Sequence, residues 1–285
     1  MSALAITTPD LTLDEKIDAL LARLRALGPR VLVAFSGGVD STVVMAAAHR
    51  ALEAGALGVV AKSESNTTDD VALCEGLAAE HGFALRVIEY SELAIPNYAS
   101  NPANRCYYCK SELYDRLTAV ARAEGFGAVC DGTNADDGGD YRPGLKAVAE
   151  RGVLSPLRDC GITKAEVRAI AKRWGLPNHD KPAAPCLSSR VPYGERITED
   201  KLTQVALAEK YLRGLGVTGN LRCRHHGEVA RIEVEPEAFP ILLAHRDRLV
   251  REYRRLGFRW ITLDLAGFAS GGLNAVLSDD KPPTG

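Results

Sequence analysis

The stretch AFSGGVDST, residues 34–42, decides the fold of this 285-residue chain. A continuous apolar run, VLVAF at 31–35, enters the stretch, and a helical segment of small residues, VVMAAAHRAL, follows it. A buried run that turns through glycines into a helix is typical of a parallel strand in an α/β protein. The glycines let backbone N–H groups approach an anion, and the positive end of the following helix points to the same place. The stretch therefore predicts a phosphate-binding loop between a strand and a helix.

Similar apolar runs recur outward from this loop, with helix-length segments between most of them. They are LGVVA (57–61), ALRVIEY (84–90), AVCDG (128–132) and VLSPL (153–157). Before the first strand, Thr12 and Glu15 form a capping box at the start of an amphipathic helix. Alternating strands and helices predict an α/β fold built on a doubly wound parallel sheet.

The order of elements changes after a stretch rich in proline and glycine at 176–194. Beyond it the pattern reads helix, strand, strand, helix, strand, which predicts a smaller α+β domain. We expect a nucleotide-binding domain over 1–185, a substrate-binding or oligomerisation domain over 186–275, and a disordered tail over 276–285.

Composition narrows the class of function. The net charge is −2 and no lysine-rich patch is visible, which argues against nucleic acid and anionic membranes as partners. The seven cysteines are odd in number and irregularly spaced, which favours a reducing compartment, so we expect a cytoplasmic protein. No apolar run approaches the roughly 20 residues needed to cross a bilayer, and no targeting segment is visible.

The phosphate loop resembles the SGGxDS loop of the PP-loop ATP pyrophosphatases. It has neither the lysine of a Walker A motif nor the spacing of a Rossmann fingerprint. The resemblance implies that the loop holds the pyrophosphate end of ATP and that Asp40 holds Mg²⁺. It implies further nucleotide contacts at Ser63, which ends the second strand, and in GTNADD (132–137) after the fourth, where Asp137 assists the metal. The full nucleotide set is Ser36, Gly37, Gly38, Asp40, Ser41, Thr42, Ser63, Gly132, Thr133, Asn134 and Asp137.

A narrower resemblance comes from NRCYYCK (104–110), GTNADD and CLSSRVPYGERIT (186–198), which occur in the same order in the LarE family. That family contains ATP-dependent sulfur transferases, the pyridinium-3,5-bisthiocarboxylic acid mononucleotide synthases of nickel-pincer nucleotide assembly. The resemblance spans about residues 12–275. It implies that the chain adenylates a carboxylate of a pyridinium dicarboxylate mononucleotide, releases pyrophosphate, and replaces AMP with sulfur. It also implies a homo-oligomer.

Some LarE proteins donate the sulfur of one cysteine, and others hold an iron–sulfur cluster on three. This sequence has all three, Cys106, Cys109 and Cys186. The resemblance therefore implies a [4Fe-4S] cluster with one iron that lacks a protein ligand and could carry the sulfur to be donated.

Other interpretations of these cysteines stay open from the residues alone. The spacing also suits a Cys₃His zinc site with His179, His225 or His226, or a redox pair, and Cys186 could give up its own sulfur without a cluster. For the whole chain, the alternatives are a PP-loop tRNA thiolase and a non-catalytic nucleotide or iron–sulfur sensor.

Arginines supply the candidate substrate contacts. In LRCRHH (221–226) alternation places Arg222 and Arg224 on one strand face. With Arg142 and Arg190 they are predicted to bind the carboxylates and the phosphate of the substrate, because guanidinium groups pair with such oxygens bidentately.

Overall fold

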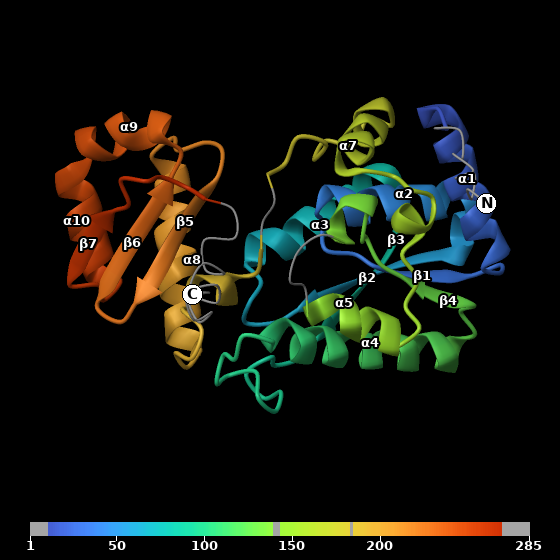
Figure 1. Cartoon of the computed structure of the whole chain (residues 1–285), viewed down its shortest axis with the longest axis horizontal. Coiled ribbons are helices and arrows are strands. Elements are labelled where there is room, and N and C mark those ends of the chain that lie inside the picture. The colour runs from blue at the N-terminus through green and yellow to red at the C-terminus, as the bar shows by residue number, and fades with distance from the viewer. Residues whose placement is uncertain (1–10, 139–142, 183–184, 270–285) are drawn as a thin grey trace, which may run out of the picture.

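A four-stranded parallel sheet forms the centre of the larger part of the molecule (Figure 1). The computed structural model describes residues 11–138, 143–182 and 185–269. The strands are β1 (Val31–Ala34), β2 (Ala56–Lys62), β3 (Ala84–Glu89) and β4 (Ala128–Cys130), in the order β3-β2-β1-β4. In the register, Val33 of β1 pairs with Gly58 on one side and with Cys130 on the other.

Helices cover both faces of this sheet, and the alternation of strand residues explains why. Val31 and Val33 point into a core shared with α1, α2, α3 and α7, whereas Leu32 points into a core shared with α4 and α5. The helices are α1 (Leu13–Ala26), α2 (Val39–Leu52), α3 (Thr68–His81), α4 (Arg105–Glu124), α5 (Pro143–Glu150), α6 (Pro156–Asp159) and α7 (Lys164–Arg173), with short 3₁₀ turns η1 (Glu53–Gly55) and η2 (Ala135–Gly138). A strand buried on both faces needs apolar side chains at every position, which is the pattern of VLVAF.

The direction of winding reverses beside β1. The chain runs from β1 through β2 to β3 on one side, and then crosses by α4 to β4 on the other side of β1. In open α/β sheets, ligands bind at the carboxyl ends of the strands where the strand order reverses. The two loops that follow β1 and β4 lie at this switch point. The predicted doubly wound α/β fold is confirmed.

The apolar run at 153–157 does not form a strand of the sheet. It contributes one parallel bridge, between Cys130 and Leu154, before Pro156 begins α6. Proline supplies no N–H for a ladder but suits the first turn of a helix, which explains the early end.

The C-terminal module contains a second sheet, ordered β5-β6-β7. Its elements are α8 (Glu199–Gly214), β5 (Leu221–His226), β6 (Val229–Val234), the 3₁₀ turn η4 (Pro236–Ala238), α9 (Phe239–Ala244), α10 (Arg246–Arg255) and β7 (Trp260–Leu263). The predicted order of elements is observed, except that the second helix is interrupted at His245. A separate hydrophobic core forms between these helices and the sheet.

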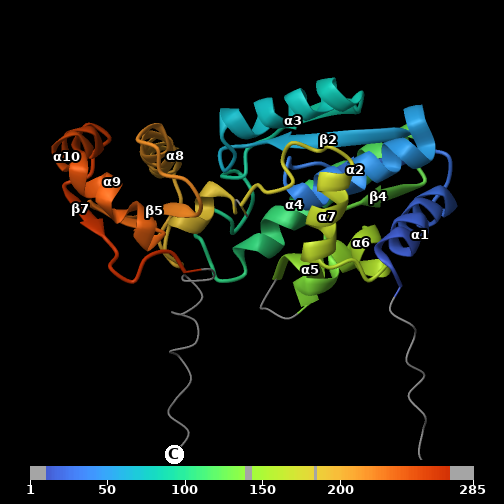
Figure 2. The same ribbon diagram turned by 90° about the horizontal axis from the view of Figure 1, so that it is seen from above.

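A further hydrophobic cluster joins the two parts of the chain. Ile95 and Tyr98, which precede α4, pack with Leu187, Ile197 and Val205, which lie in or after the 3₁₀ turn η3 (Leu187–Arg190). Figure 2 shows the C-terminal module beside the larger part, connected by the segment that leads into α8. The boundary at residue 185 stays a prediction, and the tail 276–285 lies outside the described residues.

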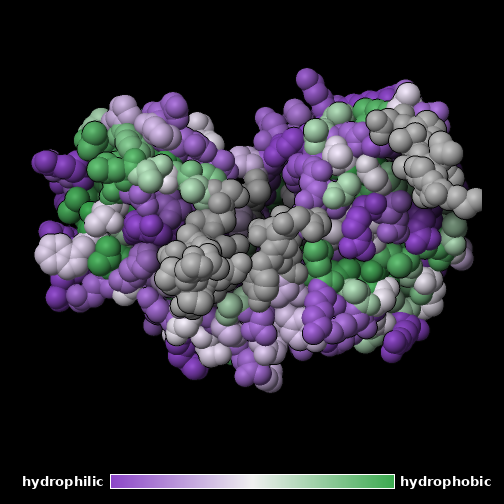
Figure 3. Space-filling model, in the orientation of Figure 1, coloured by the Kyte–Doolittle hydropathy of each residue, from purple (hydrophilic) through white to green (hydrophobic). Residues whose placement is uncertain are grey.

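Polar and apolar groups are distributed unevenly over the surface. On the face shown in Figure 3, hydrophobic groups gather over the end of the C-terminal module that carries α9 and α10. Leu243 and Trp260 of this module are 66% and 61% exposed. Within the described ranges, no helix is both long and apolar enough to span a membrane.

Candidate active site

The phosphate loop closes between β1 and α2. Gly37 has φ +69°, a conformation that favours glycine, and an added Cβ there would come within 2.9 Å of Cys74 Sγ. The Ser36 amide donates a 3.2 Å hydrogen bond to Ser41 Oγ, and Ser41 Oγ in turn donates to the Gly38 carbonyl at 3.0 Å. No side chain of the described residues caps α2. Amide groups of its first turn therefore face the loop and can bind an anion.

The loop after β4 packs directly on this helix start. A Cβ on Gly132 would lie 2.7 Å from the backbone nitrogen of Ser41, so the close approach requires glycine. Asn134 Nδ2 donates to Asp40 Oδ1 at 3.0 Å, and the other Asp40 oxygen pairs with the ammonium of Lys164. The structure thus brings the predicted residues of the two loops together and adds a cation at Asp40.

Buried hydrogen bonds fix both loops from behind. Asp131, which precedes Gly132, accepts hydrogen bonds from Thr133 Oγ1 at 2.6 Å and Ser155 Oγ at 2.8 Å. Asp137 Oδ2 accepts the Asn134 amide at 2.9 Å. Asn178, which follows α7, donates to the Gly37 carbonyl at 3.0 Å and to Thr42 Oγ1 at 2.9 Å. The metal role predicted for Asp137 stays a prediction, because the described contact of its carboxylate is structural.

Ser63 lies at the same edge of the sheet, where β2 ends. Its hydroxyl donates to Asn66 Oδ1 at 2.8 Å and lies 3.4 Å from Ser65 Oγ. All three predicted nucleotide segments therefore follow carboxyl ends of neighbouring strands, as the ligand site of an open α/β sheet requires.

The two cysteine-bearing segments meet at this edge as well. Cys106 and Cys109 occupy the first turns of α4, and Cys186 immediately precedes η3. The segments touch where Arg105 Nη1 donates to the Ser188 carbonyl at 2.9 Å. Burial raises the pKa of the Cys186 thiol above its ordinary value, and the positive charge of Arg105 opposes this while Cys106 and Glu92 add to it. Cys186 therefore lies within electrostatic range of the other cysteine segment.

A buried carboxylate lies beside Cys109. The thiol donates to Glu92 Oε1 at 2.9 Å, and Tyr98 OH donates to Glu92 Oε2 at 2.8 Å. Tyr98 OH also lies 2.6 Å from Ser188 Oγ, which connects the carboxylate to the Cys186 segment. Burial, followed by the charge of Glu92, holds the pKa of Cys109 well above its ordinary value. The thiol is therefore protonated in this arrangement.

The donor set fits a cluster in its chemistry. All seven cysteines are free of disulfides. Three of them lie in the two segments that meet here, and thiols are the soft ligands that iron–sulfur clusters take. The arrangement is not one of ligation: across residues 11–138, 143–182 and 185–269, no three His, Cys, Asp or Glu side chains form a metal-binding group. Ligation by Cys109 would require its thiol to leave Glu92. Of the remaining cysteines, Cys74, Cys130 and Cys223 are buried, and Cys160 is half-buried.

The predicted substrate arginines are more buried, and more fully paired with carboxylates, than the predicted position on an open strand face suggests. Arg224 donates two hydrogen bonds to Glu233 Oε2, at 2.9 and 2.8 Å, and Arg190 pairs bidentately with Glu209 at 2.8 Å. Burial, and then the charge of Arg190, lower the pKa of Arg222 to about 10. Arg142 lies outside the described residues.

Arg190 and Arg224 also hold the cysteine segment. Arg190 Nη1 donates to the carbonyl of Cys186 itself at 3.1 Å, and Arg224 Nη1 donates to the carbonyl of Ser189 at 2.8 Å. The arginines of the C-terminal module therefore lie next to the third cysteine.

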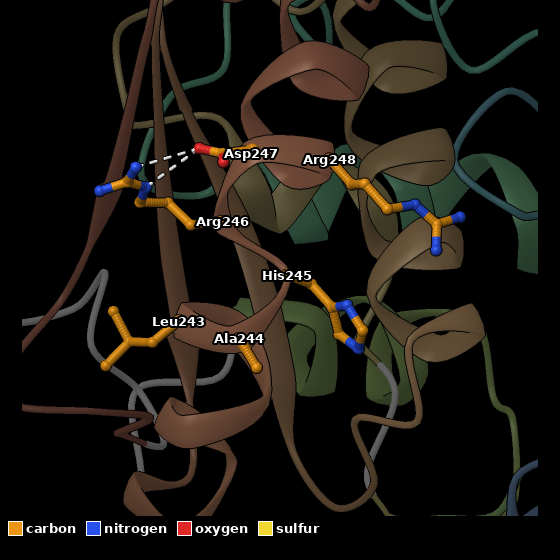
Figure 4. Close-up of a pocket in the computed structure, with 6 residues that line it drawn as sticks. All are labelled: Leu243, Ala244, His245, Arg246, Asp247 and Arg248. Carbon is orange, nitrogen blue, oxygen red and sulfur yellow. Dashed lines mark hydrogen bonds and ion pairs between the residues drawn. The ribbon is translucent and has the colours of Figure 1, made fainter.

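A hollow of about 230 Å³ lies elsewhere, at the break between α9 and α10 (Figure 4). It is lined by Leu243, Ala244, His245, Arg246, Asp247 and Arg248. Arg246 pairs with Asp247, and Arg248 points away from that pair. The hollow has no residue in common with the loops described above.

Several residues of the site were not predicted. Lys164, Asn178, Glu92 and Arg105 reach it only through tertiary contacts. Lys164 had a partial signal, because the capping box of Thr163 and Glu166 fixes where α7 begins. The others stand in loop or helix-start sequences that give no indication of their partners.

Comparison with known proteins agrees with this geometry. The chain is 41% identical over 268 residues, covering 94% of its length and 96% of the relative, to a pyridinium-3,5-bisthiocarboxylic acid mononucleotide synthase of Lactiplantibacillus plantarum. It is 47% identical over 251 residues, 87% of its length and 93% of the relative, to an uncharacterized protein of a Synechocystis species. A tRNA-specific 2-thiouridylase of Thermobifida fusca is 32% identical, over 54% of this chain and 51% of that protein. No model of a protein family matches the sequence.

The similarity to the synthase covers 94% of the chain and therefore extends over both of its parts. The thiouridylase shares only about half of the chain, which supports the wider PP-loop superfamily. The fold, the loops at the switch point and the near full-length similarity agree, and the chain belongs to the LarE family of ATP-dependent sulfur transferases.

Proposed function

We propose that this chain uses ATP to adenylate a carboxylate of a pyridinium dicarboxylate mononucleotide and converts it into a thiocarboxylate for nickel-pincer nucleotide assembly. One observation carries the proposal: the two cysteine segments contact each other, and the Cys186 segment is also bonded to the loop after β2, the strand next to the one that enters the phosphate loop. The name of the Lactiplantibacillus relative supports the same substrate class.

The loop residues suit the first half of the reaction. A carboxylate oxygen attacks the α-phosphorus of ATP, and the bond from that phosphorus to the pyrophosphate breaks. The amides at the start of α2 and the hydroxyls of Ser36 and Ser41 can bind the departing phosphates. Asp40 would hold Mg²⁺, which neutralises charge on the leaving pyrophosphate. Lys164 would then exchange its contact with Asp40 for one with phosphate.

Adenylation prepares the second half. A carboxylate is a poor electrophile near neutral pH, and the acyl adenylate supplies AMP as a leaving group. Sulfur attacks the acyl carbon, and the carbon–oxygen bond to AMP breaks. A [4Fe-4S] cluster on Cys106, Cys109 and Cys186 would supply an iron without a protein ligand that can carry this sulfur. In this arrangement the three cysteines would hold the sulfur source.

Arg222 remains a candidate substrate contact. Its guanidinium is buried, and its pKa is lowered to about 10 because burial and neighbouring arginines disfavour the charge. A substrate phosphate or carboxylate would relieve that cost. Arg190 and Arg224 hold the Cys186 segment in place, and through it they would align sulfur with substrate. We retain Arg142 as a fourth candidate from the sequence.

The variant Cys186→Ala separates the adenylation step from the sulfur-transfer step. The variant should lose thiocarboxylate formation and keep most of its substrate-dependent pyrophosphate release, because the phosphate loop does not include Cys186. Loss of both activities would make Cys186 structural and contradict the proposed sulfur delivery. Cys160→Ala is the matched control, because its half-buried thiol lies outside the site.

Purification under anaerobic conditions, followed by assays for iron and labile sulfide, identifies the sulfur source. About four irons per chain would support the cluster. Bound zinc would indicate the Cys₃His zinc site instead. A metal-free protein that completes a single turnover would indicate that Cys186 gives up its own sulfur.

We also propose that the chain forms a homo-oligomer. The support is the exposure of large apolar side chains on the C-terminal module, with Leu265 83% and Trp260 61% exposed. Light scattering during size-exclusion chromatography measures the mass directly, and a monomeric mass at micromolar concentration would exclude this part of the proposal.

A further inference from the structure

The loop after β2 makes contacts in two directions. Ser63, its first residue after the strand, is one of the nucleotide contacts that the resemblance implies. The next residue, Glu64, turns its carboxylate toward the segment that follows β3. Its Oε1 accepts the Ser91 hydroxyl at 2.5 Å, and its Oε2 accepts the backbone amide of Glu92 at 2.9 Å. One side chain therefore fixes the backbone position of the carboxylate that holds Cys109.

The same loop also holds the third cysteine, by a different bond. The carbonyl of Ser65 accepts the amide of Leu187 at 3.0 Å, and Leu187 directly follows Cys186. Ser65 and Glu92 are each 4% exposed, whereas the bond from the Glu92 amide to Glu64 is only partly buried. Two neighbouring residues of one loop thus position two segments that are far apart in sequence.

These bonds differ in how they can be removed. The contact to the Glu92 segment depends on the Glu64 side chain, whereas the contact to the Cys186 segment depends on the Ser65 backbone. A substitution at position 64 should release the first segment and leave the second in place.

We propose that Glu64 is a positioning residue that couples nucleotide binding to the sulfur site. The inference rests on the proposed function, because it assumes that ATP binds against Ser63. Nucleotide in that position orders the loop, and the ordered loop fixes Glu92 through Glu64 and Leu187 through Ser65. Bound nucleotide therefore holds the cysteines in alignment for sulfur transfer for a larger fraction of the time.

The test is hydrogen–deuterium exchange of the full chain, read at the amides of Glu92 and Leu187. The probe is an ATP analogue with a methylene group between the α and β phosphorus atoms, which cannot release pyrophosphate. In the wild type the analogue should slow exchange at both amides, by about fivefold or more. In Glu64→Ala, the Glu92 amide should exchange fast with or without the analogue, while the Leu187 amide should still respond. That response also shows that the variant is folded.

Glu80→Ala is the matched control, because Glu80 is exposed near the carboxyl end of α3 and should leave both responses intact. A wild type that binds the analogue without slowing either amide overturns the coupling and leaves the proposed function standing. A response of the Glu92 amide that survives in Glu64→Ala, or a Leu187 response that is lost with it, overturns the role of Glu64. A wild type that does not bind the analogue overturns the proposed function as well.

Discussion

Asp40 is the residue at which the contacts of the phosphate loop converge. Its carboxylate accepts a hydrogen bond from Asn134 of the loop after β4 and forms an ion pair with Lys164 at the start of α7. Its own backbone lies in the first turn of α2. An acidic side chain there can balance Lys164 before ATP binds and hold a metal ion afterwards. Both states need a negative charge, which the isosteric amide lacks.

Asp40→Asn should therefore lower substrate-dependent pyrophosphate release by about 10²- to 10³-fold, the usual loss when a charged transition-state contact is removed. The measurement is pyrophosphate formed per chain at saturating ATP and Mg²⁺. Asp18→Asn, on the exposed face of α1, should have no effect. An Asp40→Asn protein with wild-type rates would exclude a role in the chemistry.

The arginines illustrate which part of a site can be predicted from sequence. Alternation in LRCRHH placed Arg222 and Arg224 on one face correctly, because the side-chain period of a strand is fixed. It could not predict that this face is buried against Glu233 or that Arg224 holds Ser189. Such partners come from a neighbouring strand and a distant turn, and their identity depends on tertiary register.

At the level of elements, α7 and its capping box determine where Lys164 lies. Thr163 and Glu166 cap the helix reciprocally, and Lys16 of α1 donates to Glu166 at 2.8 Å. Burial raises the pKa of Glu166, but the hydrogen bonds from Lys16 and Thr163 outweigh it, so the pKa lies below 4.5. A carboxyl group with a lowered folded-state pKa stabilises the fold above its unfolded pKa and stops doing so as the pH falls.

Glu166→Gln should consequently cost about 1 kcal/mol of unfolding free energy at pH 7, the usual net contribution of one hydrogen bond. The difference from the wild type should shrink as the pH falls below 4.5. Urea unfolding of the variant and the wild type, at pH 7 and below pH 4.5, measures this difference in unfolding free energy. Lys16→Met should cost a similar amount, and the double variant little more than either; additive losses would contradict a shared interaction.

The contact between β4 and α2 gives a second test at this scale. Gly132→Ala places a Cβ 2.7 Å from a backbone nitrogen, and neither backbone can yield cheaply. We expect a loss of about 1–3 kcal/mol in stability and a higher KM for ATP, because the two loops are pushed apart. Gly76→Ala, in α3 with nothing near its Cβ, should instead gain about 0.5–1 kcal/mol. Equal effects of the two substitutions would contradict the packing argument.

Elements with local signals were predicted well, and those that depend on neighbours were not. The capping box at Thr12 and Glu15 places the start of α1 correctly, and the glycine turn places α2. The expected strand at 153–157 is reduced to one bridge because Pro156 begins a helix. An apolar run alone cannot indicate how many hydrogen bonds the adjacent strand still offers.

The whole molecule depends on one cluster that belongs to both parts. Tyr98 and Ile95 come from the larger part, and Ile197 and Val205 lie at the entrance to the C-terminal module. The same cluster lies beside Cys109, so packing between the parts supports the cysteine site directly. The order of elements predicted two domains but could not predict the hydrophobic cluster between them.

Ile197→Ala should cost about 2–5 kcal/mol, because the side chain is 1% exposed and leaves a cavity. Limited proteolysis should then cut the segment 176–196 faster while both larger cores stay protected. Fragments that end near residue 185 would support the predicted domain boundary. Leu243→Ala, at a 66% exposed position, is the control, and equal cleavage of the two variants would contradict the role of the cluster.

The bond between Arg105 and Ser188 joins residues 83 positions apart, and this has a consequence for a chain that is still being made. At the usual pace of translation, Ser188 follows Arg105 out of the ribosome by roughly 4 to 16 seconds. During that interval Cys106 and Cys109 are present on the nascent polypeptide without Cys186, the third cysteine of the proposed cluster site. If the proposed cluster forms on these cysteines, iron and sulfide delivered to the growing chain would meet an incomplete binding set, and assembly would have to wait until synthesis has passed the third thiol.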